Sequence, residues 1–245
     1  MAVAFVSGGS KGIGLEAVKR LLEQGHEVIT CSRNPEIWAQ SMEDDPKLKS
    51  ADYICLDITD EKALDEAFQY IENKYGKLDI AINNASPSLA SGGSFDEVAV
   101  GDLRSTLDND FWAQALCLKY QLNLMSSGAR IVNLSSINGL RPTPSAAMYS
   151  ATKHAIEGLT RSIAVDAIKK GIRVNSVAPG VTWTPRWEEK QQSDPNIREH
   201  VSKLVPARRF GEASEVVDAV MYLLSDKAEY IVGHTLVIDG GLSLT

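Results

Sequence analysis

The chain has 245 residues, of which 44% are hydrophobic and 23% are charged. A chain of this size buries roughly 70 to 75% of its unfolded surface in one core. Since no compositional break divides it, we expect a single domain over residues 1–245. A net charge of −7 without any basic cluster argues against a nucleic-acid-binding protein.

Targeting and redox signals point to a cytoplasmic protein. No apolar run reaches the ~18 residues of a membrane span, and a strand-like run follows Met1 directly, so neither a membrane segment nor a leader is expected. Cys31, Cys55 and Cys117 lie far apart in apolar segments, which predicts buried free thiols in a reducing compartment. The four histidines show no ligand spacing, so no metal is expected.

The first strand and helix are joined by a glycine-rich turn. An apolar run covers residues 2–7, helical periodicity covers 12–24, and the turn reads G-G-S-K-G-I-G with Gly8, Gly12 and Gly14. Glycines let the backbone approach a pyrophosphate, which the helix amino terminus attracts. The spacing differs from the more familiar G-x-G-x-x-G. Its place between strand and helix favours a dinucleotide site over a plain tight turn.

Two cations bear on the choice of dinucleotide. Arg33 follows the second strand, residues 26–32, about 20 residues after the glycines, where an NAD-binding fold usually has an acid. Arginine suits the 2′-phosphate of NADP, and Lys11 in the turn can meet the same phosphate. Exposed loop cations are the alternative, but the pattern favours NADP(H).

The middle of the chain alternates strands and helices after an irregular polar segment, 35–50. A strand ends at Asp57, which either accepts a hydrogen bond from adenine or caps the helix expected at 60–75. The strand at 78–83 runs into N-N-A-S, and strand ends of this kind form the ligand crevice of open α/β sheets. The loop 86–94 that follows is either a wall of the site or mobile.

The strongest chemical signal lies between Ser136 and Lys153. Ser136 ends the expected strand 129–136, and a helix over 145–170 places Tyr149 and Lys153 one turn apart on one face. A free tyrosine titrates near pH 10, and a cation one turn away stabilises its phenolate, which suits acid/base work on a carbonyl or alcohol. Tyr70 and Lys74 have the same spacing, and we interpret them as a solvated helix face.

The last third completes the alternation. A long helix over 102–125 precedes the strand 129–136, and a sixth strand spans 172–179. Residues 181–210 then break the alternation and form either a substrate lid or a packing excursion. A final helix and strand follow at 214–225 and 235–238. The pattern predicts an α/β fold with a Rossmann-like, doubly wound parallel sheet of about seven strands and helices on both faces.

Taken together, these motifs resemble the short-chain dehydrogenase/reductase family in its single-domain form, including its 3-oxoacyl-[acyl-carrier-protein] reductase-like carbonyl reductases. The matching motifs are S-G-G-S-K-G-I-G at 7–14, N-N-A-S at 83–86, Ser136 with Tyr149 and Lys153, P-G-V-T-W-T at 179–184, and V-I-D-G-G near the end. The resemblance covers essentially the whole chain. It implies a small-molecule substrate, no nucleic acid or membrane partner, and a homodimer or homotetramer formed through the two long helices.

The resemblance also implies the cofactor contacts, with Tyr149 and Lys153 reaching the ribose in addition to their acid/base work. Contacts to the phosphates, the adenosine and the nicotinamide end are expected from Gly8, Ser10, Gly12, Ile13, Gly14, Asp57, Ile58, Asn84, Ala85, Pro179, Gly180, Val181, Thr182 and Thr184.

Two residues depart from the family pattern. Ser86 replaces the glycine of N-N-A-G, and the helical position that normally carries a proton-relay asparagine holds Asp110 by register, with Asn109 one residue earlier. We expect an NADPH-dependent carbonyl reductase, with 3-oxoacyl-carrier-protein reduction, helped by Lys169 and Lys170, or an inactive NADP sensor as alternatives.

Overall fold

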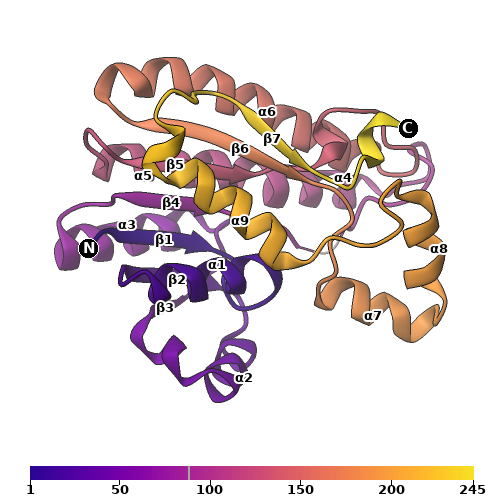
Figure 1. Cartoon of the computed structure of the whole chain (residues 1–245), viewed down its shortest axis with the longest axis horizontal. Coiled ribbons are helices and arrows are strands. Elements are labelled where there is room, and N and C mark those ends of the chain that lie inside the picture. Colours follow the sequence, from indigo (N-terminus) through magenta and orange to yellow (C-terminus); the bar gives the residue numbers. More distant parts are fainter. Residues whose placement is uncertain (88) are drawn as a thin grey trace.

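The computed structural model describes residues 1–87 and 89–245; Ser88, within the loop expected as a site wall, lies outside the described residues. One parallel sheet has the strand order β3-β2-β1-β4-β5-β6-β7 (Figure 1). The direction of winding reverses between β1 and β4, which is where ligands bind in open α/β sheets. The strands are β1 (Val3–Ser7), β2 (Glu27–Ser32), β3 (Asp52–Cys55), β4 (Ile80–Asn83), β5 (Arg130–Leu134), β6 (Arg173–Pro179) and β7 (Thr235–Ile238).

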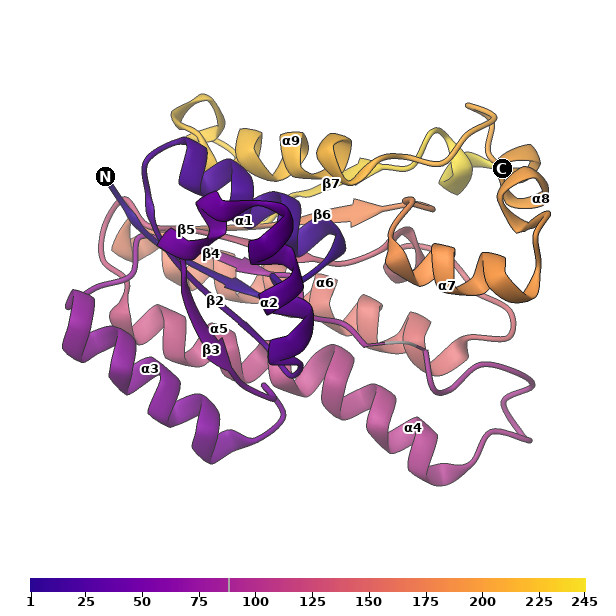
Figure 2. The same ribbon diagram turned by 90° about the horizontal axis from the view of Figure 1, so that it is seen from below.

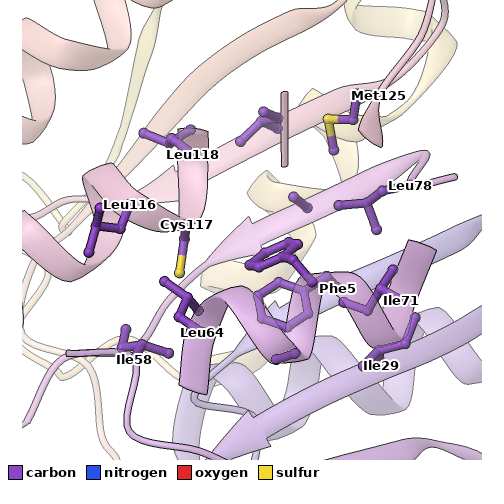
Figure 3. Packing of buried hydrophobic residues seen from close by; sticks show 14 of the residues in the cluster. Phe5, Ile29, Ile58, Leu64, Ile71, Leu78, Leu116, Cys117, Leu118 and Met125 are labelled. Carbon is purple, nitrogen blue, oxygen red and sulfur yellow. The ribbon is translucent and has the colours of Figure 1, made fainter. Parts of the chain in front are cut away.

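Both faces of the sheet are buried under helices, and successive side chains of each strand point to opposite faces. In β1, Phe5 enters one hydrophobic cluster while Ala4 and Val6 enter the other. Phe5 packs with Ile71 of α3 (Glu61–Tyr75) and Cys117 of α5 (Ala113–Leu124) (Figure 3). The expected α/β fold is therefore confirmed.

Helices cover both faces of this sheet. α3 and α5 lie on one side and α9 on the other (Figure 2). Within the described chain, no helix is long and apolar enough to cross a membrane. The helices are α1 (Gly12–Glu23), α2 (Pro35–Asp44), α3 (Glu61–Tyr75), α4 (Val100–Leu107), α5 (Ala113–Leu124), α6 (Ala147–Ala167), α7 (Pro185–Ser193), α8 (Ile197–Leu204) and α9 (Ala213–Leu224).

The prediction of an irregular segment over 35–50 was wrong, because these residues form α2 and a 3-10 helix, Pro46–Ser50. The Asn34 side chain caps α2 by accepting hydrogen bonds from two backbone amides, and a proline opens the helix. Trp38 is only 3% exposed and anchors this polar helix to the core. Leu48 of the 3-10 helix is fully buried in the same cluster, so two apolar side chains anchor a segment whose composition is that of a loop.

The long helix expected over 102–125 is interrupted by a π-helical turn, Asp108–Trp112, between α4 and α5. A π turn adds a residue to the helical repeat and changes which side chains face inward. Asp110 consequently points into the protein and is 2% exposed.

Residues 181–210 contain α7 and α8, which lie beyond the carboxyl ends of the strands (Figure 2). Trp183 and Trp187 pack edge-on against Phe210, each with ring centres 5.1 Å apart. This aromatic cluster gives the segment a small core of its own.

The cysteine prediction was wrong at one position. Cys31 and Cys117 are buried free thiols, but Cys55 is exposed. It ends β3, the edge strand of the sheet.

Candidate active site

A cavity of about 410 Å³ lies at the carboxyl ends of the strands, within the usual size range of ligand pockets. Three of the sequence-predicted site residues do not line this cavity, namely Asp110, Gly14 and Val181. The sequence-predicted residues that do are Gly8, Ser10, Lys11, Gly12, Ile13, Arg33, Asp57, Ile58, Asn84, Ala85, Ser136, Tyr149, Lys153, Pro179, Gly180, Thr182 and Thr184.

The glycine turn leaves bare backbone at one wall of this cavity. Gly8 has φ +72°, which favours glycine, and a Cβ at Gly14 would lie 2.2 Å from the Gly8 carbonyl oxygen. No side chain caps the amino terminus of α1, so its first amides keep their hydrogen-bonding capacity for an anion. The turn therefore fits the pyrophosphate of a dinucleotide.

Asn84 holds this turn against the end of β4. Its Nδ2 donates to the carbonyl oxygens of Ser7 (3.1 Å) and Gly8 (3.0 Å). The Ser7 hydroxyl in turn accepts from the amides of Asn84 and Ala85, both at 3.1 Å. Asn84 thus supports the shape of the glycine turn from within the protein.

Ser136, Tyr149 and Lys153 meet at another wall. Ser136 caps the short 3-10 helix Ile137–Gly139, and its hydroxyl accepts from the Asn138 amide at 3.1 Å. Gly139 allows this helix to touch α6, since a Cβ there would lie 2.8 Å from the Lys153 backbone. The close approach places the serine, which follows β5, beside the same cavity as the tyrosine of α6.

Lys153 is buried behind the tyrosine. Its side chain is 2% exposed, its Nζ donates to the Leu134 carbonyl oxygen at 3.3 Å, and it lies 5.5 Å from the centre of the Tyr149 ring. A buried ammonium needs a compensating charge. The Asp110 carboxylate provides one, with Oδ1 3.8 Å from Nζ.

The two departures from the family pattern contact each other. The Ser86 hydroxyl donates a hydrogen bond to Asp110 Oδ1 at 2.5 Å. Asn109 lines the cavity but donates to the Ser105 carbonyl oxygen at 2.9 Å. Asp110, not Asn109, therefore faces Lys153.

The far end of the cavity carries the two cations expected to recognise a phosphate. Arg33 lies 3.8 Å from Asp57, and Lys11 lies 3.4 Å from Glu189 of α7. Asp57 also accepts from the amide and hydroxyl of Thr59. It does not cap α3, because Asp60 occupies that position.

Sequence reasoning missed several lining residues. Arg186 and Ser135 are the most notable, and the Ser135 hydroxyl is buried without a partner among the described residues. Arg186 lies in the segment 181–210 and belongs to no recognisable motif, so no signal identified it. Cys31 also lines the cavity, but burial raises the pKa of its thiol to about 12, which keeps it protonated.

The second tyrosine–lysine pair does not line the cavity at the carboxyl ends of the strands. Tyr70 and Lys74 both donate to Asp52 Oδ2, at 2.8 Å and 2.5 Å, and Tyr75 donates to the same oxygen at 2.7 Å. This exposed cluster ties α3 to the start of β3. The spacing alone therefore does not make a site.

Comparison with known proteins identifies the family. Residues 8–243 match a family model described as enoyl-(acyl carrier protein) reductase. Carbonyl reductase family member 4 of Danio rerio is 33% identical over 247 residues, covering 99% of this chain and 98% of that protein. The 3-oxoacyl-[acyl-carrier-protein] reductase of Mus musculus is 34% identical over 248 residues, with coverages of 99% and 98%.

A solved structure, ElxO with NADP bound, superposes with a TM-score of 0.92 at 31% identity, and each chain is covered completely. The chain belongs to the short-chain dehydrogenase/reductase family. It is accordingly an oxidoreductase that acts on CH–OH or C=O groups.

Proposed function

We propose that the protein is an NADPH-dependent reductase of a ketone or aldehyde, reversible as an alcohol dehydrogenase. The observation that carries this proposal is one cavity lined by Ser136, Tyr149, Lys153 and the glycine turn. The printed names of the two relatives, a carbonyl reductase and a 3-oxoacyl reductase, support a carbonyl as the reacting group.

In the proposed mechanism, NADPH supplies the hydride when bound. Tyr149 donates its phenolic proton to the carbonyl oxygen, and the Ser136 hydroxyl donates a hydrogen bond to the same oxygen. Lys153, held by the Leu134 carbonyl, stabilises the phenolate that remains. The glycine turn holds the cofactor phosphates, and α7 and α8 form the lid of the site.

Preference for NADPH is proposed to come from Lys11 and Arg33. Their ion pairs with Glu189 and Asp57 are exposed, and exposed pairs contribute little, so both cations remain available to a 2′-phosphate. The likeness to ElxO with NADP bound points the same way.

Replacing Lys11 and Arg33 together by glutamine should weaken NADPH binding by about 10-fold to 100-fold, because hydrogen bonds to a charged group are lost. NADH, which lacks the 2′-phosphate, should bind the variant as it binds the native chain. Fluorescence titration with both cofactors measures the difference, and Lys47→Gln, an exposed cation outside the cavity, is the matched control. Equal affinity of the native chain for NADH and NADPH would contradict the preference.

Asp110 is proposed to be a positioning residue, because it faces Lys153 and Ser86 rather than the cavity. Asp110→Ala should lower kcat by about 10-fold to 100-fold through displacement of Lys153. Asp110→Asn keeps hydrogen-bonding groups there and should retain most of the turnover. Asp108→Ala, in the same π turn, removes a carboxylate that pairs outward with Arg104 and serves as control.

Steady-state kinetics and thermal melting separate this role from packing. A lower melting temperature for Asp110→Ala with unchanged kcat would show that the carboxylate only stabilises the fold.

Reduction of 3-oxoacyl-carrier-protein substrates is the main alternative, favoured by the relative of that name. The expected docking lysines do not support it. Lys169 and Lys170 follow the carboxyl end of α6, about 30 Å along the helix from Tyr149 at its other end. A panel of ketones, aldehydes and 3-oxoacyl thioesters separates the two activities. Binding of NADPH without turnover of any panel member would favour the third alternative, an inactive NADP sensor.

A homodimer or homotetramer is proposed as the assembly. Trp112 beside α5 and Val165 of α6 are 45% and 60% exposed, and burial of such side chains favours association. Light scattering of the purified chain measures the assembly.

A further inference from the structure

The cationic side chains that line the cavity differ in how their charge is balanced. Three of them have a carboxylate within ion-pair distance. The fourth, Arg186 in the first turn of α7, has no carboxylate partner in the part of the chain that the structure describes. The three balanced cations are Lys11, Arg33 and Lys153.

Arg186 is fixed in place without being neutralised. Its Nη2 donates to the carbonyl oxygens of Ser86 (2.9 Å) and Pro87 (2.7 Å). These backbone carbonyls are uncharged, so they orient the guanidinium without neutralising its positive charge. Nε and Nη1 have no hydrogen-bond partner among the described residues, so their N–H groups remain as donors for an anion.

A chain of contacts places Arg186 at the reacting end of the cavity. The carbonyl of Ser86 accepts from Arg186, and its hydroxyl donates to Asp110, which faces Lys153. Ser86 therefore lies between the lid arginine and the lysine behind Tyr149. The cations proposed to bind the 2′-phosphate belong to other segments, since Lys11 lies in the glycine turn and Arg33 directly follows β2.

We propose that Arg186 binds a carboxylate on the substrate, so that the preferred substrates are oxo acids, compounds that carry both a carboxylate and the reducible carbonyl. This inference rests on the proposed function and names the substrate class for that site. The other source of an anion here is the cofactor pyrophosphate. The test must therefore distinguish substrate from cofactor.

The experiment measures binding and turnover of a matched pair, a 3-oxo acid and its methyl ester. Arg186→Gln should lower the acid-to-ester ratio of kcat/KM by about 10-fold to 100-fold, because the ester lacks the charge. Arg186→Lys should restore part of the ratio. Lys190→Gln removes an exposed cation of α7 that does not line the cavity, and it should leave the ratio unchanged. The ratio cancels any general loosening of the lid.

Binding is measured separately by calorimetry on the NADPH complex of Tyr149→Phe, in which turnover does not consume the ligand. Tighter binding of the acid than of the ester, lost in Tyr149→Phe/Arg186→Gln, supports the inference even if the native chain reduces neither compound. Binding of the acid that depends on Arg186, without reduction of either compound, would contradict the proposed reductase function but not the inference about Arg186. An unchanged ratio overturns the inference, and an unchanged ratio with weakened NADPH binding assigns Arg186 to the pyrophosphate.

Discussion

Replacing Tyr149 by phenylalanine should lower turnover by about 10²-fold to 10⁴-fold, the usual contribution of a positioned general acid. The substitution removes one oxygen from a residue that lines the cavity, while the glycine turn remains intact. NADPH affinity should therefore change little. Stopped assays of turnover and fluorescence titration of NADPH measure the two effects.

The chain contains its own control for this substitution. Tyr70 precedes Lys74 by the same four residues on α3, but its hydroxyl binds Asp52 at the surface. Tyr70→Phe should leave turnover unchanged and slightly lower the melting temperature. Full activity in Tyr149→Phe would rule out the tyrosine as the proton donor.

Gly14→Val should weaken NADPH binding by about 10-fold to 100-fold and destabilise the protein by roughly 1–3 kcal/mol, because the site is overpacked. A Cβ at Gly14 would lie 2.2 Å from the Gly8 oxygen and 2.4 Å from Asn84 Nδ2. The turn must then move away from the end of β4. Thermal melting and NADPH titration measure both consequences.

A second helical glycine separates this clash from a general effect of adding side chains. Gly101 lies in the first turn of α4, and a Cβ there would meet no atom within 4 Å. Gly101→Ala should be neutral or slightly stabilising, as expected from helix propensity. Normal NADPH affinity in Gly14→Val would show that close packing of the turn is not needed for the cofactor.

The sheet and the main walls of the cavity could be predicted from sequence because local patterns determine them. Apolar runs of strand length, separated by helical periodicity, define a parallel sheet. Ligands in such a sheet lie at the carboxyl ends of its strands. The glycine turn, Asn84 and Ser136 each follow a strand, so their positions in the chain were sufficient to place them near one another.

Other features depend on contacts between distant segments. The polar helix α2 is anchored by the burial of Trp38, which composition does not reveal. Arg186 reaches Ser86 across 100 residues of sequence, and no periodicity links them. Ser86 and Asp110 were each recognised as departures from the family, but only the fold brings them into hydrogen-bond contact.

The central claim is transfer of a hydride to a carbonyl carbon in the cavity that contains Tyr149. We would incubate the chain with NADPH deuterated at its reactive carbon and a panel of ketones, aldehydes and oxo acids, and analyse the products by mass spectrometry. The account predicts a product alcohol that carries one deuterium on the former carbonyl carbon, and formation of that product about 10²-fold to 10⁴-fold more slowly with Tyr149→Phe. Tight binding of NADPH without deuterium in any product would contradict it.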